Sequence, residues 1–568
     1  MGRSLQPIDE QVTVKKLENL WIYNSAYQCF DRGSITFGPA IEHVQRDSET
    51  IGGEGLYLIP GFIDIHMHIE SSMTTPTEFS NAVLPHGTTT IVADCHEVAN
   101  VFGVQGLCDY MDLPSVVDVF YAIPSSVPST SMELETSFGP IDADQVEYLC
   151  KRKDIIALGE IMNANDLFSE SDNRTKRIID TFKNQKPGFP IEGHCPRITG
   201  EQLSRFIASG VDSDHTHQTA ASIQEKLSAG MFLEIQRKSV NKEVIDALKA
   251  PELAGRFCFC TDDVLPDMLA NEGHLDAILS DALALGMRPE QVIYAATYSP
   301  SRRMNLLDRG IIAPGRRADF ILIDDLETLH IHSVYKNGTL VYEQGSGLLA
   351  HSKLPMLKKE YLHSIKRRPL FAEQFDLSLE SGEREITVIE REESTTFTRF
   401  AKQHIHHRGG SFSFRQYGLS LIAVIERYGH EAPIIPAFMK NGLTRAGAIC
   451  SSWAHDSHNL LVLASSVELA VRAVNKVIAE QGGIALVDES EESFIPLPYG
   501  GIISVEPIAV LSGHIQQVRT WLVEHGYQAR EEIMNFAVLS LPVSPELKIS
   551  DKGLVDVRKQ QLVDWKKQ

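Results

Sequence analysis

The stretch LIPGFIDIHMHIESSM, residues 58–73, closes an apolar run with two histidines, His66 and His68, separated by one residue. In a β-strand, residues i and i+2 point to the same face, so both imidazoles can reach one ion. Buried, hydrogen-bonded histidines also occur in ordinary protein cores. This stretch alone therefore leaves a packed pair and a metal-binding pair equally open.

The sequence around these histidines predicts the fold to which their strand belongs. Between residues 58 and 263, short β-branched runs alternate with helix-like stretches, which is typical of a parallel sheet with crossover helices. Eight parallel strands in about 200 residues favour a (β/α)8, TIM-like barrel, whose active site lies at the carboxyl ends of its strands. The eight strand candidates end at His66, Asp94, Ser126, Glu160, His194, His215, Gln236 and Asp262.

The barrel is predicted for residues 58–303, and the sequence segments before and after it are predicted to form β-structure. Residues 1–57 and 304–345 contain short alternating segments and turn signals such as Asn337-Gly338, and we expect them to form one small β-sandwich domain. Residues 346–382 are interpreted as a linker. From residue 383 to 568 a further α/β pattern predicts an additional C-terminal domain, with helices expected over 465–481 and 512–526. The fold class is therefore α/β.

The composition limits the class of protein. With 43% hydrophobic and 23% charged residues, the chain has the make-up of a globular protein. Its net charge of −22 argues against nucleic acid as a partner. No apolar run approaches the ~20 residues that cross a bilayer, so no membrane partner is expected. The N-terminus lacks the order of a signal peptide, and the eight cysteines form no CxxC pair, so we expect a cytoplasmic protein.

The strand endings contain an unusual number of metal-binding side chains. Imidazole and carboxylate groups suit divalent ions of the Zn, Mn or Fe type, and six of them can hold two ions with a carboxylate as bridge. This pattern favours a metal site over packed histidines. The six candidate ligands are His66, His68, Glu160, His194, His215 and Asp262.

Longer motifs at these positions carry a family resemblance over nearly the whole chain. PGFIDIHMHIESSM, TTTIVADCHEVANVFG, LGEIMN, EGHCPRITG and SSWAHDSHN are similar to motifs of the adenine deaminase family within the amidohydrolase superfamily. The resemblance implies that His66 and His68 bind the more buried ion and that His194 and His215 bind the second. It implies that Glu160 bridges the two, where many superfamily members use a carboxylated lysine, and that Asp262 contacts the first ion and the bridging solvent.

The resemblance also implies a reaction. Adenine and water would give hypoxanthine and ammonia by attack of a metal-bridging hydroxide on purine C6, with Asp262 and Glu160 as catalytic residues. The implied cofactors are two divalent transition-metal ions, with Mn or Fe(II) favoured over Zn, and the implied partners are a purine base and a second copy of the chain in a homodimer. The alternative is an amidohydrolase that acts on another N-heterocycle or a cyclic amide. A non-catalytic member of the fold would be expected to lack ligands, yet all six are present.

The candidate substrate-binding residues lie close to the strand ends or far along the chain. The serines after His68 could instead cap the next helix, and the SSWAHDSHN segment could be an ordinary polar turn. Two positions depart from the family pattern, because Thr216 replaces an acidic residue and Gln236 replaces an arginine. Deamination is therefore better supported than adenine as substrate. The substrate-side candidates are Glu70, Ser71, His96, Glu97, Gln236, Asp456 and His458.

Overall fold

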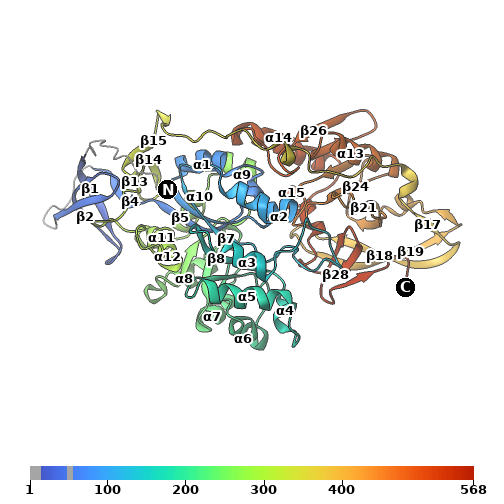
Figure 1. The fold of residues 1–568 in the computed structure, drawn as a ribbon, viewed down its shortest axis with the longest axis horizontal. Coiled ribbons are helices and arrows are strands. Elements are labelled where there is room, and N and C mark those ends of the chain that lie inside the picture. Colours follow the sequence, from blue (N-terminus) through green and yellow to red (C-terminus); the bar gives the residue numbers. More distant parts are fainter. Residues whose placement is uncertain (1–13, 48–54, 568) are drawn as a thin grey trace, which may run out of the picture.

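The computed structural model describes residues 14–47 and 55–567. Residues 1–13 and 48–54, which belong to the predicted 1–57 β segment, lie outside the described residues. Along the longest axis of the molecule, Figure 1 shows a flanking sheet around β1 and β2, then the helices and strands of a barrel, then the sheets of the C-terminal part.

Eight parallel strands form the barrel, as expected from the sequence. Five of them pair in the order β5-β6-β7-β8-β9 and three in the order β10-β11-β12. These two sets of strands are joined at both edges. At one edge the Asp212 N–H, just before β10, donates to the Ile191 carbonyl of β9 at 3.1 Å. At the other edge a β-bridge between Met67 and Asp262 joins the segment after β12 to β5. The strands are β5 (Phe62–Met67), β6 (Thr88–Asp94), β7 (Asp118–Ile123), β8 (Ile155–Ile161), β9 (Ile191–Gly193), β10 (Ser213–Asp214), β11 (Phe232–Ile235) and β12 (Phe257–Phe259).

Helices follow these strands around the barrel (Figure 1). Several begin at a capping side chain: Thr75, Asn173, Thr219 and Asn241 each accept a hydrogen bond from a backbone N–H in the first turn. The helices are α1 (Pro76–Val83), α2 (His96–Met111), α3 (Ala143–Leu149), α4 (Ala164–Phe168), α5 (Arg174–Gln185), α6 (Gly200–Ala208), α7 (Ala220–Ser228), α8 (Lys242–Leu248), α9 (Pro266–Asn271), α10 (Leu275–Ala284), α11 (Pro289–Ala296) and α12 (Tyr298–Arg303).

The segments before and after the barrel pair in one eight-stranded sheet of order β16-β15-β14-β13-β4-β1-β2-β3. Its strands alternate between two cores, because successive side chains point to opposite faces. Leu58 packs in a small core of the sheet itself, whereas Ile59 packs in the large core shared with the barrel. The strands are β1 (Lys15–Asn24), β2 (Cys29–Phe37), β3 (Ile41–Asp47), β4 (Tyr57–Pro60), β13 (Phe320–Asp325), β14 (His330–Lys336), β15 (Thr339–Glu343) and β16 (Gly347–Leu348).

A connection with little regular structure leads to the C-terminal part, which contains an eight-stranded sheet of order β19-β18-β22-β21-β24-β23-β25-β26. Helix α13 (Val467–Ala479) packs on β23, β24 and β25, and α14 (Ile508–Glu524) packs on α9 of the barrel. Both helices overlap the ranges expected from the sequence. The sheet strands are β18 (Gly382–Arg391), β19 (Thr398–His407), β21 (Ser420–Ile425), β22 (Ala437–Lys440), β23 (Ala448–Ser451), β24 (Leu460–Ala464), β25 (Gly483–Val487) and β26 (Glu492–Pro496).

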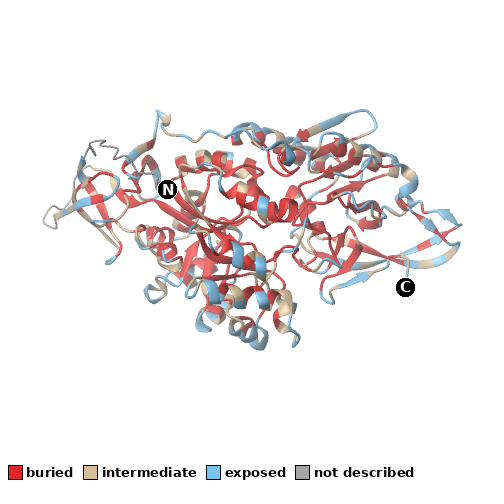
Figure 2. Cartoon of the chain, viewed as in Figure 1, coloured by how far each residue is buried: buried red, intermediate tan, exposed pale blue. Residues whose placement is uncertain are grey.

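The remaining C-terminal elements are small. Two-residue strands β17 (Ser378–Leu379) and β20 (Gly410–Ser411) pair with each other, and α15 (Glu532–Ala537) follows α14. A three-stranded sheet contains β27 (Leu547–Ser550), β28 (Gly553–Asp556) and β29 (Gln561–Val563). Figure 2 shows that burial extends from the barrel strands into the strands of the C-terminal sheet. Among the helices of the described residues, none combines the length and the apolar composition that a membrane crossing requires.

Candidate metal centre and active site

Glu160, on β8, lies between two groups of histidines at the carboxyl ends of the barrel strands. Its Oε1 lies 3.4 Å from His68 Nε2. Its Oε2 lies 2.8 Å from His194 Nδ1 and 3.4 Å from His215 Nε2. Two sets of ligand atoms, each within 4.8 Å of one another, share this residue: one set includes His66 and His68, and the other includes His194 and His215. One carboxylate oxygen therefore faces His68, and the other faces His194 and His215.

Asp262, three residues after the end of β12, brings a second carboxylate to the same place. Its Oδ1 lies 3.4 Å from His68 Nε2 and 3.8 Å from His66 Nε2. Its backbone N–H donates to the His66 carbonyl at 3.0 Å, so the end of β12 is held against β5. Asp262 adopts a left-handed backbone with φ of 59°, a conformation in which Asp and Asn are the best tolerated residues after glycine.

The side chains present fit a pair of divalent cations. His66 Nε2 and His215 Nδ1 are buried and have no hydrogen-bond partner among the residues that the structure describes, which is costly unless another group meets them. Burial alone would raise the pKa of Glu160, but His215 and His194 hold it well below its usual range. An ionised carboxylate among imidazoles is the donor set that divalent transition metals accept.

Neighbouring groups fix the orientation of these ligands. His68 Nδ1 lies 2.8 Å from the backbone carbonyl of Asp94, which leaves Nε2 facing Glu160 and Asp262. The Asp94 carboxylate accepts a hydrogen bond from the Glu160 N–H at 3.1 Å. Gly159 allows this approach, because a Cβ there would lie 2.1 Å from Asp94 Oδ2.

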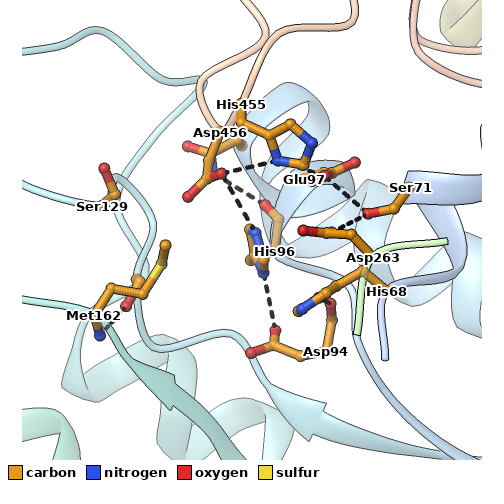
Figure 3. A network of polar contacts seen from close by, with 12 residues as sticks. His68, Ser71, Asp94, His96, Glu97, Ser129, Met162, Asp263, His455 and Asp456 are labelled. Carbon is orange, nitrogen blue, oxygen red and sulfur yellow. Dashed lines mark hydrogen bonds and ion pairs between the residues drawn. The ribbon is translucent and has the colours of Figure 1, made fainter. Parts of the chain in front are cut away.

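Beside the metal ligands, buried polar side chains meet around Glu97, in the first turn of α2 (Figure 3). Ser71 Oγ donates to Glu97 Oε1 at 3.3 Å and to Asp263 Oδ1 at 2.7 Å. His455 Nδ1 lies 2.9 Å from Glu97 Oε1, and His458 Nε2 lies 3.5 Å from Oε2. The C-terminal part thus reaches the barrel mouth, and it meets the predicted substrate-side residues there.

His96 and Asp456 face each other in the same region (Figure 3). His96 Nε2 lies 3.7 Å from Asp456 Oδ1, and His96 Nδ1 lies 3.7 Å from Asp94 Oδ1. Asp456 Oδ2 is buried and has no hydrogen-bond partner within residues 14–47 and 55–567. Asp94, His96 and Glu160 present ligand-type atoms within 4.8 Å of one another. His96 therefore lies between Asp456 and the candidate metal ligand Glu160.

The other two substrate-side candidates contact protein groups. Glu70 Oε1 accepts a hydrogen bond from the Glu97 N–H at 3.2 Å, and burial beside Glu97 raises the pKa of Glu70 to about 7. Gln236 Nε2 donates to the His215 carbonyl at 2.7 Å. Thr216, the other departure from the family pattern, turns its hydroxyl to the Asp214 carboxylate, with both oxygens at 3.0 Å.

Comparison with known proteins fits this arrangement. The amidohydrolase family model matches residues 57–341, and the model of the adenine deaminase C-terminal domain matches residues 395–561. A protein named adenine deaminase from Clostridium perfringens is 42% identical over 561 residues, which cover 96% of this chain and 98% of that protein. This chain belongs to the adenine deaminase family. A relative of the same name from Lactobacillus delbrueckii subsp. bulgaricus is 42% identical and covers 90% of this chain and 91% of its own.

Membership of the adenine deaminase family confirms the resemblance that the motifs indicated. The match to the family's C-terminal domain contains His455, Asp456 and His458, which meet the barrel at Glu97 and His96. Membership of the amidohydrolase family also implies the use of divalent metal ions.

Three residues near the ligands, two of them buried and Asp263 partly buried, were not among the predicted site residues. Glu234 Oε2 lies 3.8 Å from His66 Nδ1, Asp263 accepts from Ser71, and His455 contacts Glu97. Each left a trace in the sequence: an acid two positions before Gln236 in an otherwise apolar strand, a doubled acid after β12, and a histidine beside Asp456. Strand alternation places Glu234 and Gln236 on the same face, which could have identified the first of them.

Proposed function

We propose that this chain is a metal-dependent deaminase that converts adenine and water to hypoxanthine and ammonia. The observation that supports it best is the position of Glu160, whose Oε1 faces His68 while Oε2 faces His194 and His215, as a bridging ligand requires. The relatives named adenine deaminase, aligned over nearly the full chain, support the purine substrate.

In this proposal six residues hold two divalent cations, with Mn or Fe(II) preferred and Zn as the third possibility. His66, His68 and Asp262 serve the first cation, His194 and His215 serve the second, and Glu160 is shared. Two cations held by these residues would supply a bound water of lowered pKa, which would be a nucleophile near neutral pH.

Asp262 acts as the general base. It accepts a proton from the attacking water while the oxygen forms its bond to C6 of the purine. It then passes that proton to the ring or to the departing amine, the C6–N bond breaks and ammonia leaves. The Asp262 carboxylate lies 3.4 Å from His68 Nε2, beside the other proposed ligands.

On the substrate side, we assign His96 and Asp456 to contact with the purine. The unpartnered Oδ2 of Asp456 is an acceptor suited to a ring N–H. Glu70, Ser71, Glu97 and His458 form the layer that supports these two side chains, and Gln236 supports His215 through its backbone carbonyl.

A second candidate is an amidohydrolase for another N-heterocycle or a cyclic amide. It is favoured by the two substrate-side departures, since Thr216 bonds Asp214 and Gln236 bonds the His215 backbone instead of reaching toward substrate.

The deciding experiment measures ammonia release by enzyme reconstituted with Mn, Fe(II) or Zn. We expect release from adenine, and none from the His66→Ala variant under the same conditions. A panel of aminopurines, pterins and cyclic amides is run beside it. Turnover of another panel member, with none of adenine under any metal, would transfer the assignment to the second candidate.

A further inference from the structure

The loop 452–459, between β23 and β24 of the C-terminal sheet, is packed into the barrel mouth. Trp453 Nε1 donates to the Glu70 carbonyl at 3.3 Å, and Asn459 Nδ2 donates to the Thr136 carbonyl at 2.8 Å. Every residue of the loop is buried. We call this segment the 452–459 loop.

Glu97 is the barrel residue on which two histidines of this loop converge. His455 Nδ1 lies 2.9 Å from Oε1, and His458 Nε2 lies 3.5 Å from Oε2. The Glu97 side chain is fully buried, so water does not compete for either oxygen. Burial alone would raise the pKa of Glu97, but His455 holds it well below its usual range. Removing the charge of one partner in such a buried contact weakens it strongly.

The same histidine connects Glu97 to the group assigned to the substrate. His455 Nδ1 also lies 3.2 Å from Asp456 Oδ1, and that oxygen lies 3.7 Å from His96 Nε2. The other oxygen, Oδ2, has no hydrogen-bond partner in the described part of the chain. Asp456 is thereby held on one side by His455 and on the other by His96 (Figure 3).

We infer that Glu97 is a positioning residue, which holds His455 so that Asp456 keeps its free oxygen turned toward the purine. The inference rests on the proposed function, in which Asp456 contacts the substrate. Glu97 itself does not reach the substrate in this arrangement, because both of its oxygens face Ser71 and the two histidines of the 452–459 loop. Substrate affinity, and not metal binding, should therefore depend on Glu97.

The test compares Glu97→Gln with the wild type. We expect KM for adenine to rise tenfold or more, a loss of at least about 1.4 kcal/mol of binding, while kcat changes far less and metal content is unchanged. Hydrogen exchange should become faster in peptides that contain the 452–459 loop. The matched control is Arg519→Ala, because Arg519 Nε contacts Asp267 Oδ2 at 2.6 Å between α14 and α9, another contact between the barrel and the C-terminal part. It should leave KM and the exchange of the loop unchanged.

A double-mutant cycle with His455→Asn separates positioning from direct contact. If Glu97 acts through His455, the double variant has the KM of either single variant. Multiplicative increases in KM, or a Glu97→Gln enzyme that behaves like the Arg519→Ala control, would overturn the inference. Should Glu97→Gln fail to fold, His455→Asn carries the same comparison of KM and loop exchange. A wild-type enzyme that does not deaminate adenine contradicts the proposed function instead, and the exchange result then still reports on the contact between Glu97 and the loop.

Discussion

The backbone N–H of Asp262 donates to the carbonyl oxygen of His66 at 3.0 Å, so the last barrel strand meets the first at two of the residues assigned to the metals. Closure of the barrel therefore brings Asp262 next to His66.

Asp262→Asn should abolish turnover and leave the fold intact. The amide cannot accept the proton of the attacking water, and loss of a general base typically lowers the rate by about 10²–10⁴-fold. Asn tolerates the left-handed φ of 59° at this position as well as Asp does, so no backbone strain is added. Ammonia release measures the first effect and the melting temperature the second. An Asn variant with near wild-type activity would exclude Asp262 as the base.

Glu160→Gln should lower both activity and metal content. The variant keeps the shape of the side chain but removes the charge that the two histidine pairs share. We expect fewer than two metal ions per chain by elemental analysis and a loss of ammonia release of about two orders of magnitude or more. Glu147→Gln, on α3, serves as a control substitution of the same type. Full metal occupancy in Glu160→Gln would argue against a bridging role.

Gly159→Ala should disturb the metal site by displacing Asp94, which accepts a hydrogen bond from the backbone of Glu160. The added Cβ would lie 2.1 Å from Asp94 Oδ2 and 2.9 Å from the Ile123 carbonyl, so Asp94 must move away from the Glu160 N–H. Overpacking of this kind costs typically about 1–3 kcal/mol. We expect a lower melting temperature together with reduced kcat. Gly139→Ala is the matched control, because a Cβ there meets nothing within 4 Å. Equal behaviour of the two variants would contradict the expectation.

Glu135→Gln should change how stability depends on pH. Burial raises the pKa of Glu135 to about 7 from the usual 4.5, so the folded protein holds a proton that the unfolded chain loses. The stability that this group contributes is fully present below about pH 4.5 and is lost as pH rises through 7. The loss amounts to roughly 3 kcal/mol at pH 8. Gln cannot ionise and still offers an acceptor to Ser129 and Thr130.

The melting temperature of Glu135→Gln, relative to wild type, should therefore increase between pH 5 and pH 8. Glu133→Gln tests the same substitution at an exposed carboxylate of the same loop and should show no such increase. A flat difference for Glu135→Gln would mean that the buried carboxyl ionises as easily as an exposed one.

The barrel could be predicted from the sequence because most of its strands are short apolar runs and nearly all are followed by a polar or charged residue. His194 and His215 show how local this signal is: they follow strands of three and two residues, β9 and β10, and the motifs EGH and SDH identified them. The alternation of strands and helices then indicated that these ends converge, and the described structure brings all six candidate ligands together.

The contact between Glu97 and His455 could not be predicted in the same way. Side-chain periodicity determines which face of an element is buried, but not which distant loop covers it. The SSWAHDSHN motif indicated a functional segment and left its partner open. A different reason applies to Glu234. It is one acid within an apolar strand, and the structure shows that its side chain points to the same interior as His66, with 3.8 Å between Glu234 Oε2 and His66 Nδ1.

The flanking sheet has a consequence for how such chains can be recombined. Its strands come from both sides of the barrel, and β4, which leads directly into β5, pairs with β1 on one side and with β13 on the other. A barrel cut out at its own ends would leave Ile59 and its neighbours on the barrel side of the sheet facing water. Exchange of barrels between homologous chains should therefore succeed only when the donor supplies both ends of the sheet along with it.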